Sequence, residues 1–347
     1  MSGLPVGDMS QLKTLLGQVA GGKRLSEAEA EQAFDIIMSG NATPSQMGGF
    51  LMALRVRGEA VEEITGAARV MRAKVHRIQA PDNAIDIVGT GGDASGTLNI
   101  STGSAIVVAA CGVPVAKHGN RALSSKSGAA DVLTQLGVNI DCDMALIERA
   151  IRKAGIGFMM APRHHSAMRN VAGTRVELGT RTIFNLLGPL TNPAGVKFHM
   201  LGVFARDWVE PIAHTLQRLG STAAWVVHGD GLDEITTTGA TFVAELKGGK
   251  VRTFEVTPAD AGLQRTDLAR IKGGDSTFNA KAIQGLLAGE PGPYRDIVVL
   301  NSAAALVVAG KAGNLKDGAG LAAQAIDGGQ AKATLERLVR ITTEKPA

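Results

Sequence analysis

Apolar residues recur every three or four positions through residues 1–80, a spacing typical of helices that bury one face. Residues 26–29 form a capping box that should start one helix. Thr43–Pro44 should start a second helix, which Gly58 ends, and a third is predicted over 60–74. The pattern predicts a small helical N-terminal domain.

From residue 85 the pattern changes to short β-branched runs that alternate with amphipathic helical stretches. This alternation predicts parallel strands joined by crossover helices. The runs are 85–88, 113–116, 156–159 and 223–227. Residues 240–275, rich in Gly, Thr and Lys, predict a short antiparallel excursion, and two long helices are expected at 296–308 and 320–340.

One segment, 163–190, is helical without strands, and we expect it to return to the N-terminal helices. The predicted organisation is a helical domain over 1–80 with 163–190, and an α/β domain over 81–162 and 191–347. The fold class is α/β, with a mainly parallel central sheet in the larger domain.

Composition narrows the class of protein. The 347 residues are 45% apolar and 20% charged, which is typical of two globular domains and excludes intrinsic disorder. The longest apolar stretch, 105–116, is broken by Gly112 and Pro114, so we expect no membrane span. Two cysteines, together with a first segment that lacks the regions of a signal peptide, predict a soluble cytoplasmic protein.

Charge and aromatic content bear on whether the protein binds nucleic acid. The net charge is +4 and the pI is about 9.1, which permits a local basic patch. The chain has nine Phe, two Trp and one Tyr, so it has few side chains on which single-stranded nucleic acid could stack. We expect no nucleic-acid partner.

Two polar segments follow the run 85–88. Residues 86–93 (DIVGTGGD) lead a strand into three glycines, and residues 97–102 (TLNIST) place hydroxyl and amide groups before a helix expected near Gly103. Glycines and exposed N–H groups at a helix start bind anions at the carboxyl edge of a parallel sheet. A tight turn and ordinary helix capping are the structural alternatives.

A third segment, 117–128 (KHGNRALSSKSG), follows the next run and carries three cations and several hydroxyls. It should leave the same sheet edge, where it would bind a phosphate group unless it is only a solvated loop. Gly231 to Glu234 (GLDE) is either a site for a hard cation or an exposed acidic turn. His164–His165 has no third ligand at zinc spacing.

Taken together, these motifs resemble those of the anthranilate phosphoribosyltransferase family of tryptophan biosynthesis, which has a nucleoside phosphorylase/phosphoribosyltransferase-like fold. The resemblance covers essentially the whole chain, and the stretches that carry it occur in order between residues 89 and 234: GTGGD, NIST, KHGNRALSS, SGAADVL, MAPRHH, GTRTIFNLLGPLTNP and GLDE. The resemblance implies transfer of a 5-phosphoribosyl group from phosphoribosyl pyrophosphate to anthranilate. It also implies a homodimer and two Mg²⁺ ions per subunit.

The resemblance also assigns site residues. Donor-binding positions would be Gly89, Gly92, Asp93, Thr97, Asn99, Ile100, Ser101, Thr102, Lys117, His118, Gly119, Asn120, Arg121, Ala122, Leu123, Ser124 and Ser125. Gly89, Asn120 and Arg175 would contact anthranilate, and His164–His165 would shape its pocket. Ser101, Asp233 and Glu234 would bind Mg²⁺.

The chemistry of these residue types agrees with that reaction. Mg²⁺ and Lys117 would neutralise the departing diphosphate, so no protein nucleophile is needed. Ala129, Ser166 and Gly173 depart from residues common in the family. Two alternatives remain: a pyrimidine-nucleoside phosphorylase of the same fold, and a non-enzymatic relative that binds nucleic acid through a basic face.

Overall fold

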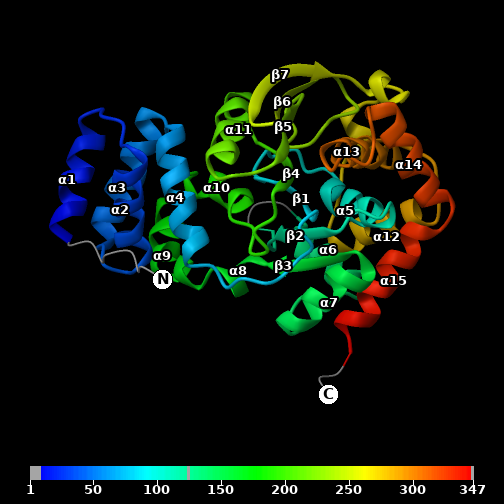
Figure 1. Ribbon diagram of the computed structural model, residues 1–347, viewed down its shortest axis with the longest axis horizontal. Coiled ribbons are helices and arrows are strands. Elements are labelled where there is room, and N and C mark those ends of the chain that lie inside the picture. Colours follow the sequence, from blue (N-terminus) through cyan, green and yellow to red (C-terminus); the bar gives the residue numbers. More distant parts are fainter. Residues whose placement is uncertain (1–8, 123–125, 345–347) are drawn as a thin grey trace.

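The computed structural model describes residues 9–122 and 126–344. Its first helices, α1 (Met9–Ala20), α2 (Glu27–Met38), α3 (Pro44–Arg57) and α4 (Val61–Ala73), form the bundle at the left of Figure 1. Both predicted helix starts are confirmed. Ser26 and Glu29 form a reciprocal capping box at α2, and Thr43 and Gln46 form another at α3.

A seven-stranded sheet with the order β3-β2-β1-β4-β5-β6-β7 forms the centre of the larger part. The strands are β1 (Ile85–Gly89), β2 (Val115–Gly119), β3 (Ile156–Met160), β4 (Phe198–Gly202), β5 (Ala223–Gly229), β6 (Thr241–Lys247) and β7 (Lys250–Val256). The first five are parallel, and β6 and β7 add an antiparallel hairpin. The predicted mainly parallel sheet and the antiparallel excursion are confirmed.

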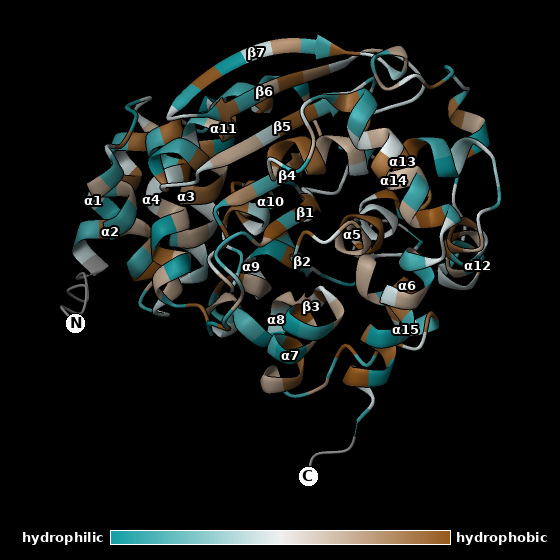
Figure 2. Ribbon diagram, turned by 45° about the vertical axis from the view of Figure 1, so that its right-hand side comes forward, coloured by the Kyte–Doolittle hydropathy of each residue, from teal (hydrophilic) through white to brown (hydrophobic). Residues whose placement is uncertain are grey.

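Helices cover both faces of this sheet, because alternate strand residues point to opposite sides. On β5, Trp225 and Val227 pack with α5 (Ile100–Ala110) and α13 (Pro293–Val308) in one apolar cluster. Ala224 and Val226 belong to a second cluster, with α11 (Val209–Arg218) and the helical bundle. The bundle therefore shares its core with one face of the sheet. Figure 2 shows the apolar colouring of α5.

The remaining helices complete the two outer layers. They are α6 (Ala129–Gln135), α7 (Met144–Ala154), α8 (Ala161–His164), α9 (Arg169–Leu178), α10 (Phe184–Leu187), α12 (Ser276–Leu287), α14 (Leu315–Asp327) and α15 (Gln330–Thr342). The segment between β3 and β4 lies against the bundle, where α9 contacts α3 and α2, and α10 contacts α4 (Figure 1). Within the described ranges, no helix combines the length and apolar character needed to cross a membrane.

Four expectations about element boundaries were wrong. β2 begins at Val115 rather than 113, because Pro114 has no N–H to donate, and it runs on through the polar residues Lys117 to Gly119. Helix α5 begins at Ile100 rather than near Gly103. The helix expected at 320–340 is two helices, α14 and α15, separated at Gly328–Gly329, where Gly329 has a φ of 76°. The central strand β4 was not among the runs that the pattern singled out.

Candidate active site

Three turns meet at the carboxyl edge of the parallel strands. The turns follow β1, β2 and β5, whose ends lie near one another because of the strand order. The Gly91 N–H donates to Asp233 Oδ2 at 2.6 Å, and the Asp233 N–H donates to Asp93 Oδ2 at 3.3 Å. The Ser101 N–H donates to Glu234 Oε1 at 3.1 Å. The acidic GLDE turn is therefore joined to both segments that follow β1.

Asn99 joins the turn after β1 to the turn after β2. Its Oδ1 accepts from Asn279 Nδ2 at 2.9 Å and from Ser127 Oγ at 3.2 Å. Tyr294 holds the Asn99 carbonyl with a hydrogen bond of 3.0 Å from its hydroxyl. The expected convergence of the GTGGD, NIST and KHGN segments at one edge is confirmed.

Glycines make the close approach of the acidic turn feasible. A Cβ at Gly89 would lie 2.3 Å from Asp233 Oδ2, and a Cβ at Gly202 would lie 1.5 Å from the Asp233 carbonyl oxygen. Both positions therefore exclude a side chain. Gly202 ends β4, and sequence reasoning missed it because its partner is 31 positions away in the chain.

Burial and mutual repulsion raise the pKa of the acidic side chains. Desolvation, followed by the charge of Asp93, raises the pKa of Asp233 to about 7. Burial and then the charge of Asp233 raise the pKa of Glu234 well above its usual value. A cation bound beside these two acids would therefore favour their ionised forms.

Lys117 differs from the loop position that we expected. It is a residue of β2, 2% exposed, and its Nζ donates to the Ile87 carbonyl at 2.5 Å. Burial lowers the pKa of Lys117, whereas the charges of Asp86, Glu234 and Asp233 raise it. Its ammonium group therefore serves as a buried counter-charge to the acidic turn.

The carboxylate oxygens at this edge suit a divalent cation that is also bound by waters and by phosphate groups of a substrate. Across 9–122 and 126–344, no group of three or more His, Cys, Asp or Glu side chains is arranged to hold a metal ion by itself. Mg²⁺ is usually bound by one or two carboxylates together with waters and substrate phosphates. Asp233 and Glu234 match that requirement, since they supply two carboxylates beside a turn rich in N–H donors.

The other predicted donor residues lie around these turns. Gly92 has a φ of 76°, and Thr97 pairs with Lys272 in an isolated antiparallel β-bridge. Ile100 and Thr102 are buried in the first turn of α5. Arg121 forms an ion pair with Asp131 at 3.2 Å, and the Ala122 N–H donates to the same carboxylate. His118 and Gly119 end β2, and Asn120 follows them. Leu123, Ser124 and Ser125 lie outside the described residues.

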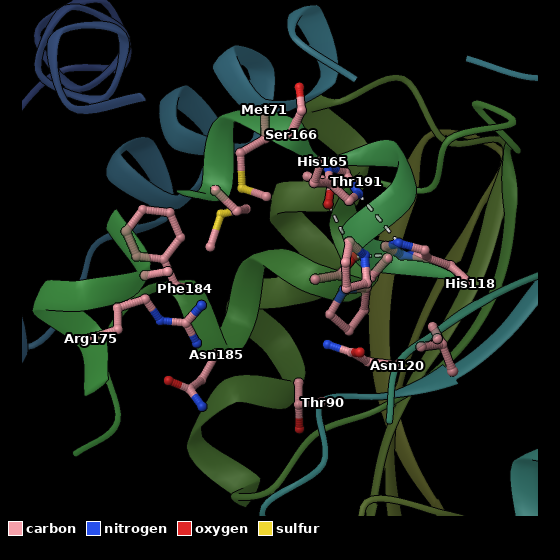
Figure 3. A pocket seen from close by; sticks show the side chains of 18 of the residues that line it. Met71, Thr90, His118, Asn120, His165, Ser166, Arg175, Phe184, Asn185 and Thr191 are labelled. Carbon is pink, nitrogen blue, oxygen red and sulfur yellow. Dashed lines mark hydrogen bonds between the residues drawn. The ribbon is translucent and has the colours of Figure 1, made fainter. Parts of the chain in front are cut away.

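A cavity of about 510 Å³ opens beside these turns, between the sheet edge and the segment that contacts the bundle. Arg175 and Phe184 lie on one side of it, and Asn120 and Thr90 on the other (Figure 3). The Arg175 guanidinium carbon lies 5.4 Å from the centre of the Phe184 ring, and burial lowers the pKa of Arg175. Arg175 forms no ion pair with any carboxylate of the described chain.

Two histidines shape the inner wall of this cavity. His165 Nε2 lies 3.3 Å from His118 Nε2, and His118 Nδ1 lies 3.2 Å from the Gly188 carbonyl oxygen (Figure 3). Burial, together with neighbouring histidine charge, lowers the pKa of His118 to about 3 and that of His165 to about 4. His164 is buried against the His76 carbonyl and does not line the cavity. The wall is therefore neutral around pH 7.

Several lining residues were missed by sequence reasoning. Met71, Thr90, Phe184 and Asn185 line the cavity, and of the departures from the family pattern only Ser166 does. Phe184 and Asn185 belong to the quoted GTRTIFN stretch, which was the available signal. Met71 comes from α4 and carried no signal, because it reaches the cavity only through the packing of the bundle on the sheet.

Comparison with known proteins defines the class first. A model described as "Glycosyl transferase family, a/b domain" matches residues 81–332, and one described as "Glycosyl transferase family, helical bundle domain" matches residues 13–75. The fold is thus that of a two-domain member of this glycosyl transferase family.

The relatives narrow that class. The chain is 67% identical to the anthranilate phosphoribosyltransferase of Azospirillum brasilense over 97% of this chain and 95% of the relative. The crystal structure of the Thermus thermophilus enzyme of that name matches with a TM-score of 0.91 and 43% identity, over 95% and 99% of the two chains. The Saccharomyces cerevisiae enzyme in complex with PRPP and Mg matches with a TM-score of 0.87 and 28% identity, over 96% and 98%. This chain belongs to the anthranilate phosphoribosyltransferase family.

Proposed function

We propose that this chain transfers the 5-phosphoribosyl group from phosphoribosyl pyrophosphate to the amine of anthranilate, with release of pyrophosphate, in L-tryptophan biosynthesis. The observation that carries the proposal is the position of Arg175. This unpaired cation lines a cavity that also reaches Gly89 and Asn120, at the edge where the glycine-rich and acidic turns meet. A planar aromatic carboxylate and a diphosphate ester would therefore occupy adjoining sites.

Binding of the donor is assigned to the turns. Exposed N–H groups of the turns after β1 and β2 would bind the diphosphate and ribose, as the sequence resemblance implies. Mg²⁺, held by Ser101, Asp233 and Glu234 together with the donor's oxygens, neutralises the charge that develops on the diphosphate. Two ions per subunit are proposed. Asp233 and Glu234 would be ionised for this role, and Lys117 favours that state from within the sheet.

Binding of the acceptor is assigned to the cavity. Arg175 would form a two-pronged contact with the carboxylate of anthranilate, while Phe184 packs against the aromatic ring. The neutral His118–His165 wall and the apolar lining would exclude water from the anomeric carbon as it gains positive charge. None of these steps needs a protein nucleophile. A homodimer in the cytoplasm completes the proposal.

Neither alternative is favoured by an observation. The relatives compared above are all named anthranilate phosphoribosyltransferase rather than nucleoside phosphorylase or nucleic-acid-binding protein. The catalytic turns also retain both the glycines and the acids that a diphosphate site needs.

The test is a continuous fluorescence assay. Purified protein mixed with anthranilate, phosphoribosyl pyrophosphate and Mg²⁺ should consume the fluorescence of anthranilate, and EDTA should stop the reaction. Omission of the donor is the control. Unchanged fluorescence over a full range of Mg²⁺ concentrations would remove the proposed function.

A further inference from the structure

A second cavity, of about 170 Å³, lies at the opposite edge of the sheet from the active site. Its walls come from the end of α4 and the residues after it, from the residues just before β4, and from the turn after α11. Because β4 begins at Phe198, Lys197 marks the amino edge of the sheet. We call this cavity the α4–β4 pocket.

Three cations line the α4–β4 pocket, and no acidic residue does. They are Arg72, Arg77 and Lys197. None of the three forms an ion pair with a carboxylate in the described part of the chain. The positive charge in this pocket is therefore not balanced by a carboxylate of the described residues.

Arg72 is fixed in place by neutral groups. Its Nε donates to the Leu190 carbonyl at 2.7 Å, and its Nη1 donates to the Leu219 carbonyl at 3.2 Å. Burial and the like charge of Arg77 lower the pKa of Arg72 to about 10. Both guanidinium groups line the same pocket, so an anion bound there would offset their like charges.

Ser221 adds a neutral hydrogen-bond donor. Its Oγ lies 3.1 Å from His199 Nε2, and burial, with the nearby charge of Arg72, lowers the pKa of His199 to about 3. His199 is therefore neutral. The Ser221 hydroxyl lines the pocket beside the three cations and can hydrogen-bond a group that binds there.

We propose that the α4–β4 pocket binds a phosphate group, either as the free ion or as the end of a phosphomonoester. Three cations with a hydroxyl donor suit a compact group of charge near −2 better than a single carboxylate. The cavity volume accommodates one such group with a few waters. Arg72 belongs to the helical bundle and Lys197 precedes β4, so the bound ion would join the two parts of the chain.

The test measures stabilisation by phosphate. Thermal unfolding is followed in EDTA with increasing inorganic phosphate, against chloride at matched ionic strength, because a ligand of the folded state raises the midpoint. The variant expected to bind phosphate more weakly is the double substitution Arg77→Gln with Lys197→Gln. Both side chains are exposed, so their replacement should not disturb folding. The matched control, Lys247→Gln with Lys250→Gln, removes the same charge from the exposed β6–β7 hairpin.

We expect the unfolding midpoint to rise with the logarithm of phosphate concentration in the wild type and in the control variant, and at least a tenfold weaker phosphate affinity in the Arg77/Lys197 variant. Its activity with anthranilate and donor should equal that of the wild type, which separates the pocket from the active site. If the double variant were unstable, Lys197→Gln alone would serve.

A second series with glycerol 3-phosphate distinguishes the two ligands, free phosphate and a phosphomonoester. A matching response identifies a phosphomonoester site, and a response to inorganic phosphate alone identifies the free ion. An equal response of all variants, or none in the wild type, would overturn the proposal.

Discussion

In the proposed function, recognition of the acceptor depends on Arg175. Its guanidinium group has no carboxylate partner in the described chain and lies on the wall of the large cavity. A charged hydrogen-bonded pair contributes about 1.5–3 kcal/mol, so Arg175→Gln should raise the KM for anthranilate about 10- to 100-fold. The KM for the donor should change little. Steady-state kinetics with each substrate varied in turn measures both, with Arg152→Gln on α7 as the control. Equal changes in the two constants would contradict the assignment.

In the proposed function, Asp233 and Glu234 bind Mg²⁺. Because the described carboxylates do not hold an ion by themselves, replacement by Asn and Gln should raise the Mg²⁺ concentration for half-maximal activity by at least about tenfold. Burial, and after it mutual repulsion, raises the pKa of both acids, so the double variant should be at least as stable as the wild type without metal. Activity against Mg²⁺ concentration and urea unfolding in EDTA give the two readings, with Asp141→Asn as control. An unchanged Mg²⁺ requirement would place the ion elsewhere.

His199 carries a pH dependence whose sign is determined by burial. The pKa of folded His199 is about 3, which lies below the unfolded value of about 6.5. Below pH 6.5 His199 therefore binds a proton in the unfolded chain but not in the folded chain. The free energy of unfolding is therefore lost as the pH falls. This one group accounts for about 2 kcal/mol between about pH 7 and about pH 5.

The measurement compares His199→Gln with the wild type by urea unfolding across that range, in a buffer without phosphate. Other titrating groups contribute equally to both proteins, so the wild-type curve should fall more steeply than that of the variant. Parallel curves would show that His199 is protonated in the folded state.

The residues of the site differ in how far the sequence alone could predict them. Gly92, Asp93 and Asp233 could be predicted to lie near one another because each follows a parallel strand, and the carboxyl ends of such strands meet at one edge of the sheet. Lys117 was placed in a loop because its neighbours are polar, whereas the pairing of β2 between β1 and β3 keeps it inside the sheet. Met71 could not be found, since its distance to the cavity depends on tertiary packing alone.

Among the elements, α2 and α4 make the closest helix contact of the bundle at Gly66. A Cβ there would lie 2.6 Å from the Glu27 carbonyl oxygen and 2.9 Å from the Glu31 backbone nitrogen. Gly66→Ala should therefore separate the helices and cost about 1–3 kcal/mol of unfolding free energy. Gly320→Ala on α14 is the control, because open space surrounds that position and alanine favours a helix. Equal urea midpoints for the two variants would contradict the contact.

Element boundaries were predictable where they depend on neighbouring residues. The starts of α2 and α3 follow from capping side chains three positions apart, a local interaction. The limits of β2 and the presence of β4 depend on hydrogen bonds to strands far away in the chain. Gly328–Gly329 divides the C-terminal helices, although the apolar spacing of 320–340 continues through the break.

For the whole molecule, the shared core predicts cooperative unfolding. Phe34 of α2 contacts Phe184 of the segment between β3 and β4, with 5.8 Å between ring centres, and the same cluster continues into Val226 of the sheet. Both tryptophans, Trp208 and Trp225, lie outside the helical bundle. Tryptophan fluorescence and far-ultraviolet circular dichroism should therefore give one coincident urea transition.

Phe34→Leu tests that coupling. The smaller side chain should lower both midpoints together, by an amount that corresponds to about 1–2 kcal/mol. Arg337→Gln on α15 is a surface control. A helical signal that is lost before any change in tryptophan emission would show that the bundle unfolds independently.

The shared core also restricts how such chains can be recombined. A chimera joined near residue 80 would receive its bundle from one parent and the opposing face, built by 163–190, α11 and the sheet, from another. The side chains in contact across this interface would then come from two different parents and would not be matched to each other. Shuffling between homologues should succeed where the bundle and its facing residues are inherited together, even though they are separated along the gene.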